Sequence, residues 1–200
     1  MNAGMGIVLL GPPGAGKSTQ GALLSTRFGL RRIASGELLH EEVRAGTTRG
    51  KTVRGYMAAG ELVPDELLID IVTAAIAATP QAGVVLDGFP RRATQARLAD
   101  DVLGRLGWVV RAAVEFSVNA ATVRARLARR RAASGRFDDD PAVVERRLRV
   151  GRPPAELLAH YRDRELLHFV DADQPVDAVA AALVDILNPG GRHVPGTSVR

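Results

Sequence analysis

The chain has 200 residues, of which 27 are basic and 22 acidic, so its formal net charge at neutral pH is +5. This length is sufficient for one domain with a sizeable core. The absence of cysteine excludes disulfides and thiolate metal sites. We find neither an apolar stretch as long as a membrane span nor a basic region followed by a hydrophobic signal segment, so we expect a cytoplasmic protein without a membrane partner.

The positive charge raises the question of a nucleic-acid partner. The basic residues are spread along the whole chain, however, and aromatic residues that could stack on bases make up only 4% of it. We therefore expect no nucleic acid as a partner, and we expect some of the basic residues to hold phosphate groups inside a cleft.

The first predicted elements are a buried strand over residues 6–10 and a helix over residues 17–24. Between them the chain reads Gly-Pro-Pro-Gly-Ala-Gly-Lys-Ser, which matches the phosphate-binding loop G-x-x-x-x-G-K-[ST] in its required setting. Such a loop directs backbone N–H groups and a helix N-terminus at an anion. We therefore predict that the phosphates of ATP are bound by Gly11, Pro12, Pro13, Gly14, Ala15, Gly16, Lys17, Ser18 and Thr19.

Lys17 stands where a lysine can reach the β- and γ-phosphates, and the neighbouring Ser18 hydroxyl can ligate Mg²⁺. Of the 27 basic residues 25 are arginine, and only Lys17 and Lys51 are lysine. A chain that uses arginine almost everywhere else keeps lysine at the position that needs a compact point charge. This strengthens the prediction that the loop binds a nucleotide.

Beyond this loop, predicted strands and helices alternate. We expect strands over residues 31–33, 84–87, 108–116 and 168–171. We expect helices over residues 92–106, 119–131 and 176–187, and mostly helical stretches over 35–78 and 141–167, the latter interrupted at 151–154. This alternation favours an α/β fold with a parallel sheet flanked by helices on both faces.

The strand expected over residues 84–87 ends in the run Asp87-Gly88-Phe89-Pro90-Arg91. A carboxylate at the carboxyl end of a strand beside a phosphate loop can hold Mg²⁺ through water. Gly88 allows a close approach of the backbone, and Arg91 offers a bidentate fork for a phosphate. The sequence therefore predicts a magnesium site at Ser18 and Asp87.

The motifs together resemble those of adenylate kinases and the wider nucleoside monophosphate kinases, from about Met5 to Leu187. They are the loop ending in Gly16-Lys17-Ser18-Thr19-Gln20, then Ala34-Ser35-Gly36-Glu37-Leu38-Leu39, Gly60-Glu61-Leu62-Val63-Pro64-Asp65-Glu66, Asp87 to Arg91 with Gln95, the arginine-rich helix with Arg126 and Arg130, and Arg136 followed by Asp138, Asp139 and Arg147. The resemblance implies a P-loop kinase fold, a monomer, and reversible Mg²⁺-dependent transfer of the ATP γ-phosphoryl group to AMP, giving two ADP.

The resemblance also implies roles for single residues. The acceptor would be bound by Ser35, His40, Glu61, Val63, Gly88, Arg91 and Gln95, where the Gln95 amide can donate to N1 of adenine and accept from its 6-amino group. Arg126 would stack on the adenine of ATP. The catalytic set would be Lys17, Arg91, Arg130, Arg136, Asp138, Asp139 and Arg147. Arg129, Arg131 and Arg146 fit no motif, and we expect them on the surface.

The implied organisation is a single nucleotide-kinase domain over residues 1–188, with a core of residues 1–34, 65–131 and 142–188. A helical segment over 35–64 would be the NMP-binding lobe. The polar segment over 132–141 would be a short lid without a structural zinc. Such lobes exclude water, which would otherwise compete as the acceptor. The Gly- and Pro-containing segment 189–200 predicts a disordered tail.

The chain departs from the family pattern at a few positions. His40 replaces an arginine that clamps the acceptor's α-phosphate, and imidazole cannot form a bidentate fork. Ser35 replaces a threonine, Ser18 replaces a glycine, and the segment 151–154 is one residue short. His40 leaves open a second acceptor class, namely another nucleoside monophosphate or a small phosphate- or phosphonate-bearing metabolite. A non-catalytic nucleotide-binding module would keep the phosphate loop but could lose the arginines that follow it.

Overall fold

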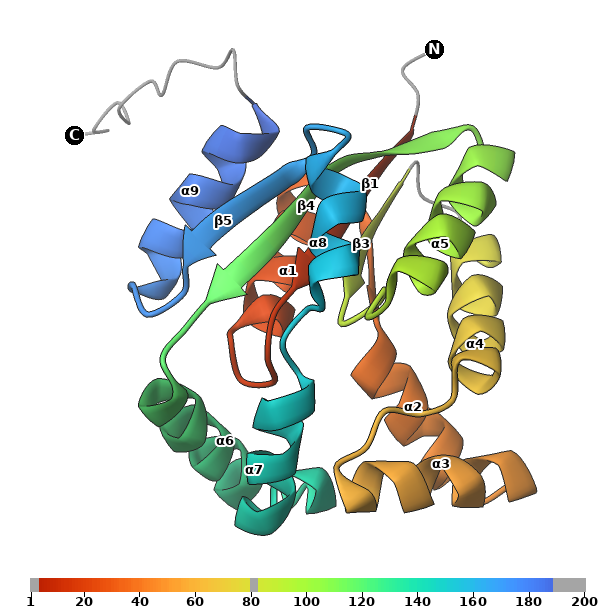
Figure 1. Cartoon of the computed structure of the whole chain (residues 1–200), viewed down its shortest axis with the longest axis vertical. Coiled ribbons are helices and arrows are strands. Elements are labelled where there is room, and N and C mark those ends of the chain that lie inside the picture. The colour runs from red at the N-terminus through yellow and green to blue at the C-terminus, as the bar shows by residue number, and fades with distance from the viewer. Residues whose placement is uncertain (1–3, 80–82, 189–200) are drawn as a thin grey trace, which may run out of the picture.

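The computed structural model describes residues 4–79 and 83–188. Figure 1 shows the elements, which follow in the order β1 (Gly4–Leu10), α1 (Lys17–Phe28), β2 (Arg31–Ala34), α2 (Ser35–Arg44), α3 (Thr48–Ala59), α4 (Asp65–Ala77), β3 (Gly83–Asp87), α5 (Ala93–Arg105), β4 (Trp108–Ser117), α6 (Ala120–Ser134), η1 (Phe137–Asp139), α7 (Pro141–Val150), α8 (Ala155–Arg162), β5 (Leu167–Asp171) and α9 (Val176–Leu187). The tail predicted over residues 189–200 lies outside the described residues.

The described strands form one five-stranded sheet in the order β2-β3-β1-β4-β5, and each neighbouring pair runs parallel. Ile7, Val8 and Leu9, in the middle of the central strand β1, have no exposed surface. A parallel strand covered on both faces needs apolar residues at successive positions, which explains why β1 reads as an uninterrupted apolar run. The predicted α/β fold with a parallel sheet is confirmed.

Helices cover both faces of this sheet (Figure 1). Successive side chains of a strand point to opposite faces, so β1 contributes to two separate core clusters. Ile7 and Leu9 belong to the cluster that includes residues of α1 and α9. Val8 and Leu10 belong to the other, which includes residues of α4, α5 and α8. The sheet thus lies between two helical layers that pack against both of its faces.

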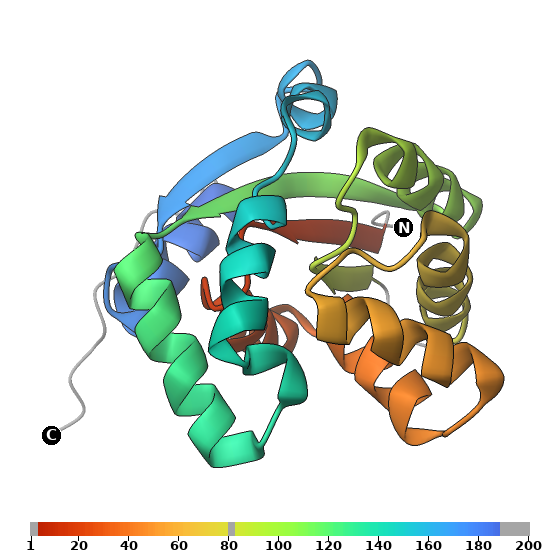
Figure 2. The ribbon, with the colours of Figure 1, turned by 60° about the horizontal axis from the view of Figure 1, so that its bottom comes forward.

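Two groups of helices face each other beyond the carboxyl ends of the strands (Figure 2). One group is α2 and α3, and the other is α6, η1 and α7. α3 contacts both η1 and α7. At the end of α3, Gly60 adopts a φ of 70°, and a Cβ there would lie 3.0 Å from the carbonyl oxygen of Val143 in α7. The two groups therefore touch in this structure.

The end of α6 differs from the sequence expectation. The helix continues to Ser134, three residues beyond the expected end at Arg131. Ala132 and Ala133 are strong helix formers, and Gly135 takes the left-handed conformation that ends the helix. Much of the segment 132–141, which was expected to be a polar lid, is therefore helical. It contains the last turn of α6 and the short η1 helix.

The connection between α7 and α8 packs against the phosphate-binding loop. A Cβ on Gly151 would lie 2.5 Å from the carbonyl oxygen of Arg147 and 2.9 Å from Cδ of Pro13. Only glycine allows this close approach. The break expected near residues 151–154 is confirmed, and it brings the end of α7 against the loop.

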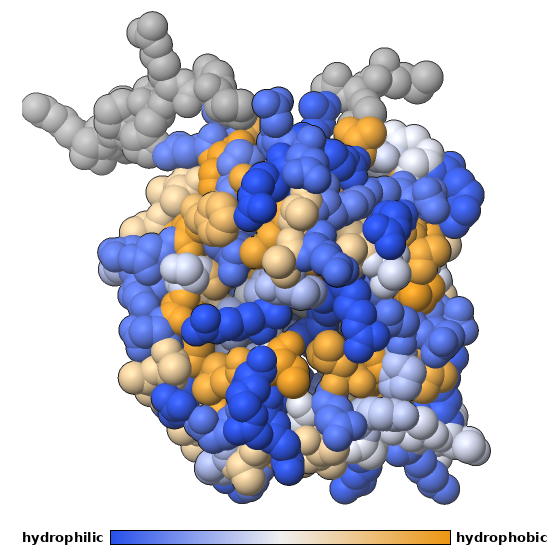
Figure 3. Space-filling view, viewed as in Figure 1, coloured by the Kyte–Doolittle hydropathy of each residue, from blue (hydrophilic) through white to orange (hydrophobic). Residues whose placement is uncertain are grey.

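The surface of the molecule is rich in hydrophilic side chains, as expected for a chain in which 24% of the residues are charged. Hydrophilic side chains cover most of the face in Figure 3, with smaller apolar areas between them. Arg129, Arg131 and Arg146 are exposed, as predicted. None of the described helices is long and apolar enough to cross a membrane.

Candidate active site

The phosphate-binding loop joins the end of β1 to the start of α1. Three of its glycines have positive φ angles, 130° at Gly11, 76° at Gly14 and 94° at Gly16. A Cβ on Gly11 would also lie 2.9 Å from the carbonyl oxygen of Phe116 in β4. These positions need glycine because residues with a side chain rarely adopt such angles. The loop leaves the N-terminus of α1 open toward a cavity.

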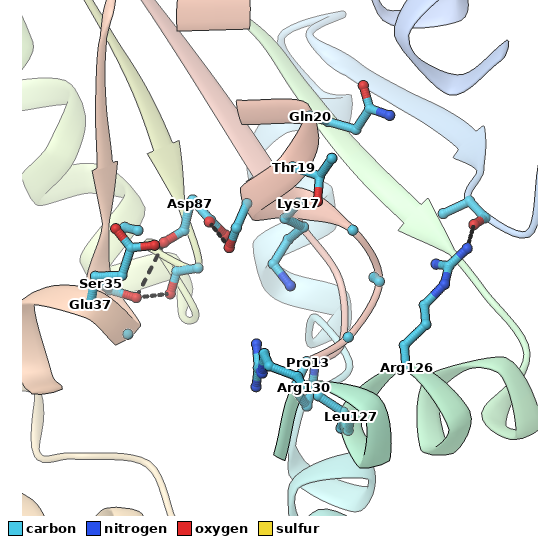
Figure 4. Close-up of a pocket in the computed structure, with 18 of the residues that line it drawn as sticks. Pro13, Lys17, Thr19, Gln20, Ser35, Glu37, Asp87, Arg126, Leu127 and Arg130 are labelled. Atoms are coloured by element: carbon cyan, nitrogen blue, oxygen red, sulfur yellow. Dashed lines mark hydrogen bonds between the residues drawn. The ribbon is translucent and has the colours of Figure 1, made fainter. Parts of the chain in front are cut away.

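Lys17 is the first residue of α1, and its side chain is buried. Its Nζ donates hydrogen bonds to the carbonyl oxygens of Gly11 at 2.9 Å and Pro12 at 2.7 Å. Burial lowers the pKa of Lys17 to about 8, although Asp87 acts in the opposite direction. Figure 4 shows the side chain extending between Asp87 and Arg130. An anion in this space would favour the charged form of the amine.

Asp87 ends β3 and is buried. The Ser18 hydroxyl donates to its Oδ2 at 2.6 Å, and a guanidinium nitrogen of Arg32 lies 3.4 Å from the same oxygen. Arg32 also forms two hydrogen bonds of 2.6 and 2.7 Å to the Glu37 carboxylate. Arg32 and Glu37 were not predicted as site residues. Their proximity to Asp87 follows from the pairing of β2 with β3, where Ala34 lies opposite Asp87.

Three arginines of the α6–α7 group converge on two buried aspartates. Arg130 donates two hydrogen bonds of 2.6 Å to Asp139. Arg147 donates to the Asp138 carboxylate at 2.8 Å and to Asp139 at 3.2 Å, and Arg136 lies 3.4 Å from Asp138. Both aspartates are 2% exposed. They hold three cations that would otherwise repel one another beside the cavity.

His40 of α2 lies against this cluster. Its Nε2 is 3.1 Å from Asp138 Oδ1 and 3.1 Å from Nε of Arg136. Its ring also contacts Phe137 edge to face, with centroids 5.4 Å apart. Burial alone would raise the pKa of Asp138, but His40, Arg147 and Arg136 together hold it well below its usual range. Asp138 is therefore an anion at neutral pH.

Arg91 lies in the segment between β3 and α5, and Gln95 lies in the first turn of α5. Arg91 donates from Nε to the carbonyl oxygen of Gly88 at 2.9 Å, and Ser35 donates to the same oxygen at 2.9 Å. Burial and the neighbouring Arg147 lower the pKa of Arg91 to about 10, which leaves it protonated at neutral pH. Gln95 is 2% exposed and its amide bonds the Arg91 backbone.

Most of these side chains line two cavities. The larger, of about 340 Å³, is lined by Pro13, Gly14, Ala15, Gly16, Lys17, Ser18, Thr19, Gln20, Ala34, Ser35, Gly36, Glu37, Asp87, Gly88, Arg91, Arg126, Leu127, Arg130, Arg136, Arg147, Ala172, Gln174, Val176 and Val179. The smaller, of about 70 Å³, is lined by Pro13, Ser35, Gly36, Leu39, Met57, Gly60, Glu61, Leu62, Val63, Leu68, Arg91, Gln95, Asp138, Arg147 and Val150. Arg91 and Arg147 border both cavities, which are therefore adjacent.

A few predicted residues lie outside these two linings. Gly11 and Pro12 contribute carbonyl oxygens to Lys17 instead. His40 and Asp139 are not among the lining residues of either cavity, and both lie behind the arginines. Arg126 lines the larger cavity and donates to the carbonyl oxygen of Ala172 at 2.9 Å (Figure 4).

The structure also adds residues to which the sequence assigned no role in the site. The apolar Leu127, Val176 and Val179 line the larger cavity near Arg126. Leu39 and Met57 do the same in the smaller cavity. Isolated apolar residues carry no signal in sequence, since most of them enter a core.

The oxygen-rich pair of Ser18 and Asp87 suits a hard cation, because Mg²⁺ prefers carboxylate and hydroxyl oxygen ligands and keeps several waters. Within residues 4–79 and 83–188, no group of three or more His, Cys, Asp or Glu side chains is arranged to hold a metal ion. A metal at Asp87 would thus depend on additional oxygens from a bound phosphate or water.

Comparison with known proteins agrees with this geometry. A family model described as adenylate kinase matches residues 9–166. An adenylate kinase of Synechococcus sp. (strain CC9311) is 41% identical over 182 residues, 90% of this chain and 97% of the relative. An adenylate kinase of Methylobacterium radiotolerans is 38% identical over 199 residues, 95% of this chain and 99% of the relative. An adenylate kinase of Thermobifida fusca (strain YX) is 38% identical over 177 residues, 88% of this chain and 94% of the relative. The chain therefore belongs to the adenylate kinase family.

Proposed function

We propose that this protein catalyses the reversible, Mg²⁺-dependent transfer of the γ-phosphoryl group of ATP to AMP, giving two ADP. The observation that carries this proposal is the convergence of Lys17, Arg91, Arg130, Arg136 and Arg147 on one cavity that begins at the N-terminus of α1. Phosphoryl transfer between two polyphosphates requires that their mutual repulsion be neutralised and their reacting oxygens aligned. This cavity offers cations and backbone N–H groups for both purposes.

In this proposal the larger cavity binds ATP. The triphosphate lies along residues 11–16, with Lys17 on its β- and γ-phosphates. Arg126 would stack on the adenine, with Leu127 and Val179 supplying apolar surface. The carbonyl of Ala172, which already accepts from Arg126, would keep that guanidinium in place.

Ser18 and Asp87 would hold Mg²⁺, largely through water. The ion would supply positive charge at the phosphates of ATP. Ser18 would contribute its hydroxyl oxygen, and Arg32 and Glu37 would set the orientation and charge of the Asp87 carboxylate.

AMP would occupy the smaller cavity. Ser35, Gln95 and the backbone at Glu61 and Val63 would surround its base. Its phosphate would meet Arg91, at the border with the larger cavity. Gly88 would allow the base to approach the backbone closely, since a Cβ there would already lie 2.9 Å from Oγ of Ser35. The two phosphates would thus meet beside Arg91 and Arg147.

Arg130, Arg136 and Arg147 would surround the transferred phosphoryl group. Asp138 and Asp139 would act behind them, by holding the guanidinium groups in a converging arrangement. Residues 35–64 and 132–141 would be the two closing lobes. We further propose, from the resemblance, that the chain acts as a cytoplasmic monomer on free nucleotides.

A coupled assay of ADP formation tests the proposal. ATP is held constant, and AMP is compared with CMP, UMP, GMP and small phosphate or phosphonate compounds. AMP should be the best acceptor, and Lys17→Ala should abolish transfer while the protein stays folded. If AMP is no better than the other acceptors, the adenylate kinase assignment falls. If Lys17→Ala retains normal rates, the catalytic use of this cavity falls.

A further inference from the structure

The Gln95 amide is engaged by the protein at both ends. Its Oε1 accepts a hydrogen bond of 2.7 Å from the backbone N–H of Arg91. Its Nε2 donates a hydrogen bond of 2.7 Å to Oδ1 of Asp65, the first residue of α4. Gln95 itself is 2% exposed and lines the smaller cavity.

These two partners fix which end of the amide is which. The Arg91 N–H can only donate, and a carboxylate can only accept. A flipped amide would place NH₂ against N–H and oxygen against carboxylate, and would lose both bonds inside a buried site. In the observed orientation, one N–H of Nε2 and one lone pair of Oε1 remain unused.

Asp65 is held in place independently of Gln95. Arg92 donates to the same Oδ1 at 2.8 Å, and the Thr94 hydroxyl lies 3.5 Å from Oδ2. Asp65 does not line either cavity. It can therefore influence a bound base only through Gln95, as a positioning residue.

The unused N–H and lone pair match one class of purine. A 6-aminopurine presents an acceptor at N1 and a donor on its 6-amino group, whereas a 6-oxopurine presents a donor at N1 and an acceptor at O6. We propose that Asp65 fixes the Gln95 amide so that the acceptor site takes 6-aminopurine and rejects 6-oxopurine monophosphates. This inference rests on the proposed function, since it concerns the base of the same acceptor.

The experiment compares kcat/KM for AMP and for inosine monophosphate, which differ at the 6 position and at N1. Wild type should strongly prefer AMP. In Asp65→Ala, the ratio of the two kcat/KM values should fall by about tenfold or more, the size of a lost hydrogen bond to a charged group. The KM for ATP should not change. In Asp65→Asn, the ratio of the two kcat/KM values should stay within about threefold of wild type. Arg92 and Gln95 both donate to Oδ1 of Asp65, so Arg92 would hold the amide oxygen of the Asn in the same place.

Three controls keep the outcome interpretable. Glu66→Ala, at the exposed next position of α4, should leave the ratio unchanged. In a Gln95→Ala background, Asp65→Ala should not change the ratio further, since coupled residues are not additive. If Asp65→Ala does not fold, Asp65→Ser replaces it, because serine suits a helix N-terminus. The serine side chain is too short to reach Gln95, so the same fall in the ratio is expected.

An unchanged ratio in a folded Asp65→Ala or Asp65→Ser protein overturns the inference. So does an equal loss for AMP and inosine monophosphate, because a purely structural role would weaken both alike. Failure of the proposed function would be visible separately, since wild type would then not prefer AMP over unrelated acceptors.

Discussion

His40 in α2 lies 3.1 Å from Asp138 in η1, and this contact joins the two groups of helices that face each other beyond the sheet. The same Nε2 lies 3.1 Å from Arg136. A single imidazole nitrogen can donate to Asp138 or accept from Arg136, but not both. His40, one of the positions expected to depart from the family pattern, thus faces the opposite helical group in this structure.

From this contact we predict that His40→Ala raises the KM for AMP by about fivefold, which corresponds to one ordinary hydrogen bond. The KM for ATP should change less, because Asp138, which His40 contacts, lines the smaller cavity and not the larger one. Steady-state kinetics with both substrates measure this. Arg44→Ala, at an exposed position of the same helix, is the control. Equal changes in both KM values would contradict the prediction.

A second prediction concerns Asp87. Asp87→Asn keeps the shape of the side chain but removes the charge that would attract Mg²⁺. We expect the Mg²⁺ concentration for half-maximal activity to rise by about tenfold or more. The additional thermal stabilisation that MgATP gives over ATP in EDTA should shrink in parallel. Asp101→Asn, at an exposed position of α5, should alter neither quantity. An unchanged Mg²⁺ requirement would argue against a metal at Asp87.

The main features of the site could be predicted from the sequence because they depend on local patterns. The phosphate-binding loop, Lys17 and Asp87 follow strands whose apolar runs are unmistakable, and parallel strands end at the same edge of a sheet. The order of the strands in the sheet could not be predicted in the same way. It depends on how each crossover connection runs, and the sequence shows only that strands and helices alternate.

Other features depend on contacts between distant segments. Asp65 meets Gln95 because α4 packs against α5, and Arg32 meets Asp87 because of the register of β2 with β3. Neither pairing has a spacing signal. The predicted end of α6 was wrong by three residues. Ala132 and Ala133 favour a helix over a loop, and the helix ends only at Gly135.

A third prediction uses two glycines of α3. A Cβ on Gly50 would overlap the carbonyl oxygen of Glu42 in α2, whereas a Cβ on Gly55 would meet nothing within 4 Å. Gly50→Ala should therefore lower the free energy of unfolding by about 1–3 kcal/mol through overpacking. Gly55→Ala should raise it by about 0.5–1 kcal/mol through helix propensity. Chemical denaturation of both variants measures the difference, and equal effects would show that the α2–α3 contact is not tight.

The fourth prediction follows from the buried amine of Lys17. Its pKa in the folded protein is lowered from 10.5 to about 8, chiefly by burial. Between these values the unfolded chain binds the proton and the folded chain does not, so the free energy of unfolding rises with pH. Well below pH 8 the amine is protonated in both states and contributes no slope. A nucleotide phosphate beside Lys17 would favour the charged form and cancel this slope.

We therefore expect the free energy of unfolding of the ligand-free protein to rise, relative to Lys17→Met, by about 2–3 kcal/mol between pH 8 and pH 10. Urea denaturation of both proteins at several pH values measures the difference, in which the titration of all other groups cancels. Wild type saturated with ATP should lose most of this pH dependence, since the triphosphate would keep Lys17 protonated. Parallel stability curves for ligand-free wild type and Lys17→Met would show that the Lys17 amine is not desolvated as its burial implies.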